Sequence, residues 1–488
     1  MTSTKNAAAP MVVVIPTARP TFVVEAAQAR ADAARRVLSD LGAAVVGPTT
    51  LVMTPEDIEA AAPFVDRDAD LVINVCASFS DASPALRLYH DLAAPLLLWS
   101  FTEPGPVGDR LWLNSLCGAN LFGHALVRAG GAVRLVHGDP DDPAVRETLA
   151  RALAGELPPP VDVPLSQGER ADAASVAAAL ARLRGTRIGV LGDPPAGFTP
   201  SEYDPDVLRD VFGIAVDHLD LKAAFASVAA VDAGTTAQET ADAVAQRPTL
   251  RDLDGEQVRR FAAVTSALRG WSADAVLAAV AVRCWPEFPT QLGVCPCSSL
   301  SRLADEGIPT ACERDVYGLT TMLLAETLGA GTTYLVDTVD LDAGDNVVRV
   351  WHCGSAATAL AADPDAARQS VHCNRKIGVA GDFALRTGPV VLARLTEDND
   401  PASSSSLRLL LAAGESLPEP NRFQGNTAAI RLATDAQQFV HGLVSGGFPH
   451  HTILAWNDVR PQLRQAADQL GILVVEWSGA AEFHEVIA

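Results

Sequence analysis

Two acidic side chains in the middle of the chain each follow a short apolar segment that is expected to form a strand. Glu313 stands where the segment 309–312 ends and a helix begins, and Asp337 comes directly after the apolar residues 333–336. Ligands of open α/β sheets bind at the carboxyl ends of the strands, so both positions suit a functional site. The alternative is that Glu313 or Asp315 only interacts with the positive N-terminal end of the following helix.

Histidines in two other segments could complete such a site. His352 ends the predicted strand 347–351, and His450 and His451 stand in the sequence Gly-Gly-Phe-Pro-His-His-Thr. Neighbouring side chains of an extended segment point in opposite directions, so at most one of the pair is expected to bind a metal, while the other could contact a substrate. Carboxylates plus imidazole, with no required thiolate, favour an octahedral divalent ion such as Mn²⁺ over structural zinc. The alternative for His352 is an ordinary interior residue.

The eight cysteines do not form a zinc-finger pattern. Cys295 and Cys297 make a Cys-x-Cys pair, and no Cys-x-x-Cys pair is present. Thiols of a large cytosolic chain are expected to be reduced. We therefore expect small, buried, apolar side chains rather than disulfides.

Charge and motif content argue against several classes of function. The 488 residues include 37 basic and 59 acidic side chains, a net charge of −22. Such a surface repels phosphate backbones and anionic lipids, which argues against nucleic-acid and membrane partners. No apolar run approaches the roughly 20 residues that span a bilayer. The first ten residues do not resemble a signal peptide, so a cytoplasmic location is expected. No phosphate-binding loop, dinucleotide fingerprint or nucleophile elbow is present.

The order of apolar segments predicts an α/β protein with three domains. Residues 1–157 alternate apolar strands with helices, which indicates a parallel sheet covered on both faces and a doubly wound, flavodoxin-like domain. A Pro-rich linker at 158–160 leads to a second doubly wound domain, 161–355, which carries the two carboxylates. Residues 356–488 predict a mixed, β-rich C-terminal domain that contains the His-His pair.

The same pattern predicts individual elements of the central domain. Its expected helices are 171–184, 254–268, 299–305 and 316–328, and its expected strands include 187–191, 215–219, 275–280, 310–312, 333–336 and 347–351.

In its second half the chain resembles the L-fucose/L-arabinose isomerase superfamily. The resemblance covers about residues 283–475; the two N-terminal α/β domains agree with it only as architecture. The segments that carry it are Cys-Glu-Arg-Asp with its helix (312–328), the strand before Asp337, Trp-His-Cys-Gly (351–354) and Gly-Gly-Phe-Pro-His-His-Thr-Ile (446–453). Two further segments are similar to the fucose-isomerase-like branch, namely Arg-Cys-Trp-Pro-Glu-Phe (283–288) and Cys-Asn-Arg-Lys-x-Gly (373–378).

This resemblance implies a metal-dependent aldose–ketose isomerase that uses Mn²⁺ or a similar ion such as Co²⁺ or Mg²⁺. By the resemblance, Glu313 and Asp337 bind the metal and act as the acid/base pair. The resemblance does not assign the base to either of them. His451 or His450 completes the ligand set, and His352 is a further ligand by analogy with the arabinose isomerases. Such enzymes move a proton between C1 and C2 through a cis-enediol, and a metal on O1 and O2 stabilises the developing charge.

The resemblance also implies a homo-oligomer, because family members are commonly trimers or hexamers. Their sugar sites are completed by a neighbouring N-terminal domain, for which Arg19 and the loop 78–81 are candidates. Trp285, Phe288 and Trp351 could form an apolar wall for the sugar, with core packing as the alternative.

One departure from the family pattern bears on the substrate. Family members often carry Glu-Gly-Asp where this chain has Glu313-Arg314-Asp315. If Arg314 faces the site, it favours an anionic substrate such as a sulfonated or phosphorylated sugar; the alternative is an arginine that faces solvent. Epimerisation through the same enediolate and a non-catalytic sugar-binding protein are the competing functions. The binding protein would leave Glu313, Asp337 and His451 without a common role.

Overall fold

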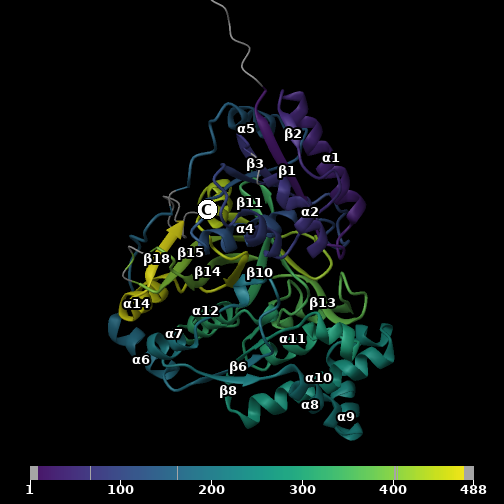
Figure 1. The fold of residues 1–488 in the computed structure, drawn as a ribbon. Helices are drawn as coiled ribbons and strands as arrows, with labels where there is room; N and C mark the ends of the chain where they lie inside the picture. Colours follow the sequence, from purple (N-terminus) through teal and green to yellow (C-terminus); the bar gives the residue numbers. More distant parts are fainter. Residues whose placement is uncertain (1–8, 66–67, 162, 401–402, 404, 478–488) are drawn as a thin grey trace, which may run out of the picture. The chain divides into compact units, whose positions relative to one another are not determined.

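The computed structural model describes residues 9–65, 68–161, 163–400, 403 and 405–477 (Figure 1). It divides into two compact units. Unit 1 comprises Met1–Pro104, Trp112–Asp162 and Val440–His450, and unit 2 comprises Gly105–Leu111, Val163–Phe439 and His451–Ala488. The first ten residues are not expected to form a signal peptide, and the first eight of them lie outside the described residues. The division into three domains stays a prediction.

Unit 1 is built on a five-stranded parallel sheet with the strand order β2-β1-β3-β4-β5. This is the flavodoxin order, so the fold predicted for the N-terminal residues is confirmed. The strands are β1 (Met11–Thr17), β2 (Ala44–Val46), β3 (Leu71–Cys76), β4 (Leu96–Ser100) and β5 (Arg134–His137). The helices are α1 (Val24–Asp40), α2 (Pro55–Val65), α3 (Ser83–Tyr89), α4 (Ser115–Arg128) and α5 (Pro143–Leu153).

Unit 2 contains a second, four-stranded parallel sheet with the order β7-β6-β8-β9. The second doubly wound sheet is therefore also confirmed. Its strands are β6 (Arg187–Leu191), β7 (Ala215–Leu219), β8 (Leu277–Val282) and β9 (Thr310–Ala311). Its helices are α6 (Ala173–Leu183), α7 (Pro205–Val207), α8 (Leu221–Ala230), α9 (Ala233–Gln246), α10 (Gly255–Asp274), α11 (Cys297–Asp305) and α12 (Val316–Thr327).

The rest of unit 2 is a nine-stranded mixed sheet, as expected for the β-rich part. Six of its strands pair antiparallel in the order β16-β11-β10-β17-β14-β15, and an additional β15–β16 pairing closes them into a barrel. The strands are β10 (Tyr334–Asp342), β11 (Val347–His352), β12 (Arg368–Val371), β13 (Gly378–Ala384), β14 (Gly388–Glu397), β15 (Leu407–Leu417), β16 (Asn426–Leu432), β17 (His451–Ala455) and β18 (Leu473–Trp477), with helices α13 (Ala436–Ser445) and α14 (Arg460–Leu470).

Two strands belong to a different sheet than the sequence predicts. The segments 333–336 and 347–351 are expected in the central parallel sheet, but β10 and β11 pair antiparallel with each other in the barrel. The reason is the short connection between Asp342 and Val347, since a parallel pairing needs a crossover of a dozen or more residues. Asp337 consequently stands inside β10 rather than after its end.

Helix α12 connects the two sheets of unit 2. It packs against β8 and β9 of the parallel sheet and against β14 and β17 of the barrel, and Figure 1 shows it between these two sets of strands. Nearly every residue of α12 is buried, so it is apolar around its whole circumference rather than amphipathic. Among the described residues, no helix is both long and apolar enough to cross a lipid bilayer.

We expect the substitution Gly425→Ala to destabilise unit 2 more than Gly388→Ala. Both glycines have a positive φ, +127° and +110°, so alanine is strained at either position, by about 1–3 kcal/mol. A Cβ at Gly388 meets no atom within 4 Å, whereas one at Gly425 lies 2.5 Å from the His352 carbonyl oxygen and 2.6 Å from Trp351 Nε1. Overpacking should add about 1–3 kcal/mol to the loss. Equal losses in urea unfolding would contradict this packing.

Candidate active site

The imidazole of His451 lies between the two carboxylates that the sequence predicts to act together. Its Nε2 is 3.1 Å from Glu313 Oε2 and 3.1 Å from Asp337 Oδ1, and its side chain is fully buried. His451 begins β17 directly opposite Asp337 of β10, so the register of the barrel places these two side chains together. Glu313 comes from the end of β9 in the parallel sheet. The site therefore draws residues from both sheets of unit 2.

Glu313 is held by its backbone as well as by its carboxylate. Glu313 and Arg314 both have φ near +59°, a left-handed conformation that costs a non-glycine residue about 1–3 kcal/mol and that clusters at functional sites. The Ser201 hydroxyl donates to the Glu313 carbonyl oxygen, and Trp285 Nε1 donates to Glu313 Oε1 at 2.8 Å. These contacts leave Oε2 directed at His451.

Asp315 fixes the orientation of His451. Its Oδ2 is 2.7 Å from His451 Nδ1 and also accepts a hydrogen bond from the buried Arg394, while its Oδ1 accepts the Gly318 N–H as the N-cap of α12. A carboxylate paired with an arginine stays ionised and can only accept hydrogen bonds, so His451 carries a proton on Nδ1 and directs Nε2 toward Glu313 and Asp337. A histidine held by a carboxylate in this way is the usual arrangement of a metal-binding imidazole.

The charges of this cluster shift the pKa values of its members strongly. Burial would lower the pKa of His451, but its contacts with Asp315, Asp337 and Glu313 raise it well above the usual value. Burial would raise the pKa of Asp315, but the charge of Arg394 and the contact with His451 hold it below the usual value. The pKa of Glu313 is likewise lowered, because the His451 contact outweighs burial. At neutral pH the carboxylates of Glu313 and Asp315 are thus ionised, and the imidazole of His451 is protonated.

His352 is buried beside this cluster but differs from His451 in its hydrogen bonding. The backbone N–H of Cys353 donates to His352 Nδ1 at 2.8 Å, so the neutral ring carries its proton on Nε2. Burial lowers the pKa of His352, which favours this neutral form. Among the described residues, His352 Nε2 has no hydrogen-bond partner. His352 therefore offers an N–H donor rather than a lone pair, although one ligand atom each of His352, Asp337 and His451 lies within 4.8 Å of the others.

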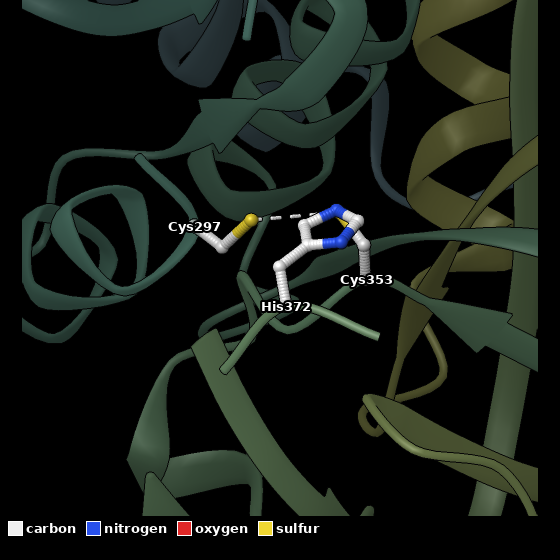
Figure 2. A group of neighbouring side chains, drawn as sticks. All are labelled: Cys297, Cys353 and His372. Carbon is white, nitrogen blue, oxygen red and sulfur yellow. Dashed lines mark hydrogen bonds between the residues drawn. The ribbon is translucent and has the colours of Figure 1, made fainter. Parts of the chain in front are cut away.

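A second group of potential ligands, Cys297, Cys353 and His372, lies close by in unit 2 (Figure 2). The two sulfurs are 3.6 Å apart, and the imidazole lies against them. His372 Nδ1 accepts the backbone N–H groups of Asn374 and Arg375 at 3.1 and 3.3 Å, so its proton sits on Nε2.

The members of this second group are electrically neutral. Burial lowers the pKa of His372 to about 3. The hydrogen bond with Cys353 lowers the pKa of Cys297, but burial and neighbouring thiols raise it to about 12. Neutral thiols around a neutral imidazole are typical of interior packing. All eight cysteines are free and buried, as the sequence predicts.

The other predicted residues take separate positions. Trp285 contacts Glu313 and packs edge-on against Phe198, which in turn lies 5.8 Å from the His451 ring. Trp351 stacks on His352 with 9° between the ring planes. Phe288 instead packs on a phenylalanine of α8 in the interior.

Arg314 does not present a free guanidinium to the carboxylates. It is buried, donates to the carbonyl oxygens of Gly192 and Ser201 at 2.6 and 2.9 Å, and stacks over Tyr203. The sequence suggests either a substrate contact or a solvent-facing side chain for Arg314. The structure shows neither, because the guanidinium is buried against backbone carbonyls. Arg314 positions the backbone around Glu313 instead.

Two residues predicted to contact substrate belong to unit 1. The backbone N–H of Arg19 donates to Ser78 Oγ at 3.0 Å, and its guanidinium lies 5.9 Å from the centre of the Phe79 ring. The ring of His450, which is buried, lies 6.2 Å from the same Phe79 ring. Unit 1 thus brings Arg19, the loop 78–81 and His450 together, while His451 belongs to the carboxylate cluster of unit 2.

Sequence reasoning missed two residues that contact the cluster, Arg394 and Phe198, and most of the role of Asp315. Arg394 carried a usable signal, because it is the one charged residue in the apolar run 389–395, where a buried arginine requires a partner. For Asp315 the sequence suggests only an interaction with the positive N-terminal end of the following helix. No pattern in the sequence points to Phe198.

Comparison with known proteins assigns the class. No family model matches the chain. A sulfoquinovose isomerase of Alkalicoccus urumqiensis is 33% identical over 466 residues, which cover 95% of this chain and 99% of that protein. A sulfoquinovose isomerase of Priestia megaterium (strain ATCC 12872 / QMB1551) is 31% identical over 94% of this chain and 98% of that protein. A sulfoquinovose isomerase of Clostridium sp. (strain MSTE9) is 30% identical over 93% of this chain and 96% of that protein.

The chain is thus an aldose–ketose isomerase, as the sequence predicts, and the two carboxylates around the buried imidazole are its candidate site. Within that class, the chain belongs to the sulfoquinovose isomerase family.

We expect Asp315→Asn to lower kcat by about 10–100-fold, because the amide no longer fixes the proton of His451 on Nδ1. Asparagine is still a good N-cap, so α12 should keep its start. The variant should also lose about 3–5 kcal/mol of stability, since Arg394 is left as a buried, unpaired charge.

The matched control is Asp254→Asn. Asp254 caps α10 in the same way but has no histidine partner, so activity should be unchanged. Steady-state kinetics and urea unfolding of both variants test the role of Asp315. An Asp315→Asn enzyme with wild-type kcat would contradict it.

Proposed function

We propose that this enzyme converts sulfoquinovose, a hexose with a sulfonate on C6, into the corresponding 2-ketose. The names of its relatives support this substrate. The observation that carries the proposal is the position of His451 Nε2, 3.1 Å from both Glu313 and Asp337. The wider resemblance to fucose-isomerase-like enzymes, a cytoplasmic location and a trimeric or hexameric assembly belong to the same proposal.

The donor set supports a divalent ion held by Glu313, Asp337 and His451. Two carboxylate oxygens and the Nε2 of His451 converge, and Asp315 supplies the hydrogen bond that a metal-binding histidine requires. Oxygen-rich sets of this kind suit Mn²⁺, Co²⁺ or Mg²⁺. When bound, the ion would polarise the carbonyl group of the sugar and stabilise the charge that develops on O1 and O2. His352 is not among the proposed ligands, because its neutral ring carries its single proton on Nε2 while Nδ1 accepts the Cys353 N–H. His451 differs, because it can release the Nε2 proton and keep the one on Nδ1.

The side chains then have distinct tasks in moving one proton from C2 to C1. One carboxylate of the Glu313–Asp337 pair removes the C2 proton of the aldose to give a cis-enediol and returns a proton to C1. The other carries the proton that passes from O2 to O1, so the reaction is balanced without a further reactant. Two carboxylates near one cation hold different pKa values, which this division of tasks requires. His352 Nε2–H donates a hydrogen bond to a sugar oxygen, and Trp285 keeps Glu313 oriented.

Removal of metal should abolish turnover, and Mn²⁺ should restore it. We expect Glu313→Gln to weaken metal binding by at least about 100-fold, because the site loses one ligand and one negative charge. The exposed Glu306→Gln, which removes only a contact with Arg269, is the control. Titration calorimetry on EDTA-treated protein measures the affinity directly, and unchanged affinity in Glu313→Gln would remove this residue from the site.

Metal binding should also depend on pH. Without the ion, the raised pKa of His451 keeps its Nε2 protonated at neutral pH. Binding at Nε2 must therefore release a proton, and the metal affinity should fall as the pH is lowered. Calorimetry in two buffers of different ionisation enthalpy counts the proton released. Binding without proton release would place the ion away from His451.

The enediol route predicts deuterium incorporation. In D₂O, sulfoquinovose recovered from the reaction should carry deuterium at C2, and the ketose should carry it at C1. Proton NMR reads both positions, and Asp337→Asn should stop both the exchange and the turnover. Ketose that forms without deuterium would indicate a hydride shift, and a C2 epimer without ketose would indicate an epimerase.

A further inference from the structure

The loop between β12 and β13, residues 372–377, carries basic side chains that the mechanism does not use. Asn374, Arg375 and Lys376 belong to the Cys-Asn-Arg-Lys motif. The loop is closed by two backbone hydrogen bonds, from His372 N–H to the Ile377 carbonyl and from Lys376 N–H to the His372 carbonyl, both of 2.9 Å. It is therefore a fixed turn that presents its side chains in a defined place.

Two chains of contacts join this loop to the active site. His372, at its start, lies against Cys353, the residue after His352 (Figure 2). Lys376 Nζ lies 3.4 Å from Gln424 Oε1, and the Gln424 carbonyl accepts the Trp351 indole N–H at 2.9 Å. Trp351 stacks directly on His352. The charges on both sides also act on His372. Besides burial, the cations Arg375 and Lys376 lower its pKa, and the carboxylate of Glu313 raises it.

A third cation joins the group from a distant part of the sequence. Arg110 Nη1 donates to Asn374 Oδ1 at 3.3 Å. The segment that contains Arg110 is hydrogen-bonded to the loop between β15 and β16. Gly108 N–H donates to the Arg422 carbonyl, and Gln424 N–H donates to the Asp109 carbonyl, both at 2.9 Å. Arg110, Arg375 and Lys376 thus gather around one turn.

This basic group is unusual in a chain of net charge −22. Within the part of the chain that the structure describes, no aspartate or glutamate forms an ion pair with Arg375 or Lys376, whereas most other arginines of unit 2 have such a partner. Arg375 is partly buried and Lys376 is exposed, so both remain accessible to an anion.

The backbone of Lys376 indicates that the side chain matters. Its φ is +56°, a conformation that glycine or asparagine adopts more easily. A lysine at such a position costs stability that a glycine would not. Conformations of this kind cluster at functional sites.

We propose that Arg375 and Lys376, with Arg110 beside them, form the subsite that binds the sulfonate group of the sugar. The proposal rests on the proposed function, in which C1 and C2 react at the carboxylate cluster and three carbons separate C2 from the sulfonate-bearing C6. The anion must therefore be bound beside the carboxylate cluster rather than within it. Arginine and lysine are the side chains that recognise a group with three acceptor oxygens and a negative charge. Arg314, which the sequence suggested for this task, is engaged by backbone carbonyls.

The test compares a sulfonated and a neutral sugar on the same variants. We expect Arg375→Gln and Lys376→Gln each to raise KM for sulfoquinovose by about 10–100-fold with little change in kcat, because each removes a charge-assisted hydrogen bond. KM for a neutral aldose such as D-glucose should not rise, and Lys376→Arg should keep most of the affinity. Arg209→Gln removes an exposed charge that is paired with Asp206 and Asp210, and serves as the control.

The outcomes separate this inference from the proposed function. Equal increases in KM for both sugars would show a structural role, and unchanged KM for sulfoquinovose would remove both residues from the subsite. If the wild-type enzyme converts only neutral aldoses, the proposed substrate is wrong. The subsite is then tested by calorimetric binding of sulfoquinovose to the wild type and to Lys376→Gln: equal affinity, or no binding to either, would overturn the subsite, and a loss in the variant would support it.

Discussion

The carboxylate of Asp315 is the constraint on which the candidate active site depends. One oxygen caps α12, the helix that lies between the two sheets of unit 2, and the other accepts both Arg394 and the Nδ1 of His451. Arg394 comes from the barrel, so this buried ion pair joins the start of α12 to β14. A fully buried carboxylate is stable only with such partners. The same pairing that keeps Asp315 ionised also decides which nitrogen of His451 is available for chemistry.

Around this centre, the two sheets contribute different kinds of residues. The closed barrel supplies Asp337 and His451 from neighbouring strands, and their relative position follows from strand register alone. The parallel sheet supplies Glu313 from a strained turn that several contacts support. Strand register gives the more rigid placement, whereas a turn can adjust as a ligand binds. Cys297, Cys353 and His372 pack beside this cluster as neutral side chains.

Much of this arrangement is predictable from the sequence where continuous apolar runs alternate with helices, as in the flavodoxin-like sheet of unit 1 and in β6–β9. The grouping of Glu313, Asp337 and His451 was predictable from a resemblance, whereas the strand-end argument holds for Glu313 only, since Asp337 stands inside β10. The prediction that β10 and β11 belong to the central parallel sheet was wrong, since the sheet to which a strand belongs depends on partners far along the chain. Helices α8 and α9 were missed because they are alanine-rich and largely exposed, although Asp220 and Asp232 stand at their caps. The role of Asp315 was hidden because its partners, Arg394 and His451, are remote in sequence.

The path of the chain near its end has a consequence for protein synthesis. After β16 the chain enters unit 1 at Val440 and returns to unit 2 only at His451, the residue that completes the carboxylate cluster. A ribosome must therefore synthesise the chain past His451 before the three side chains can meet. Until then, Glu313 and Asp337 have no imidazole between them, and Arg394 and Asp315 are the first part of the centre that can pair. Domains fold in order as they emerge from the ribosome, so the nascent enzyme stays inactive until its last strands are in place.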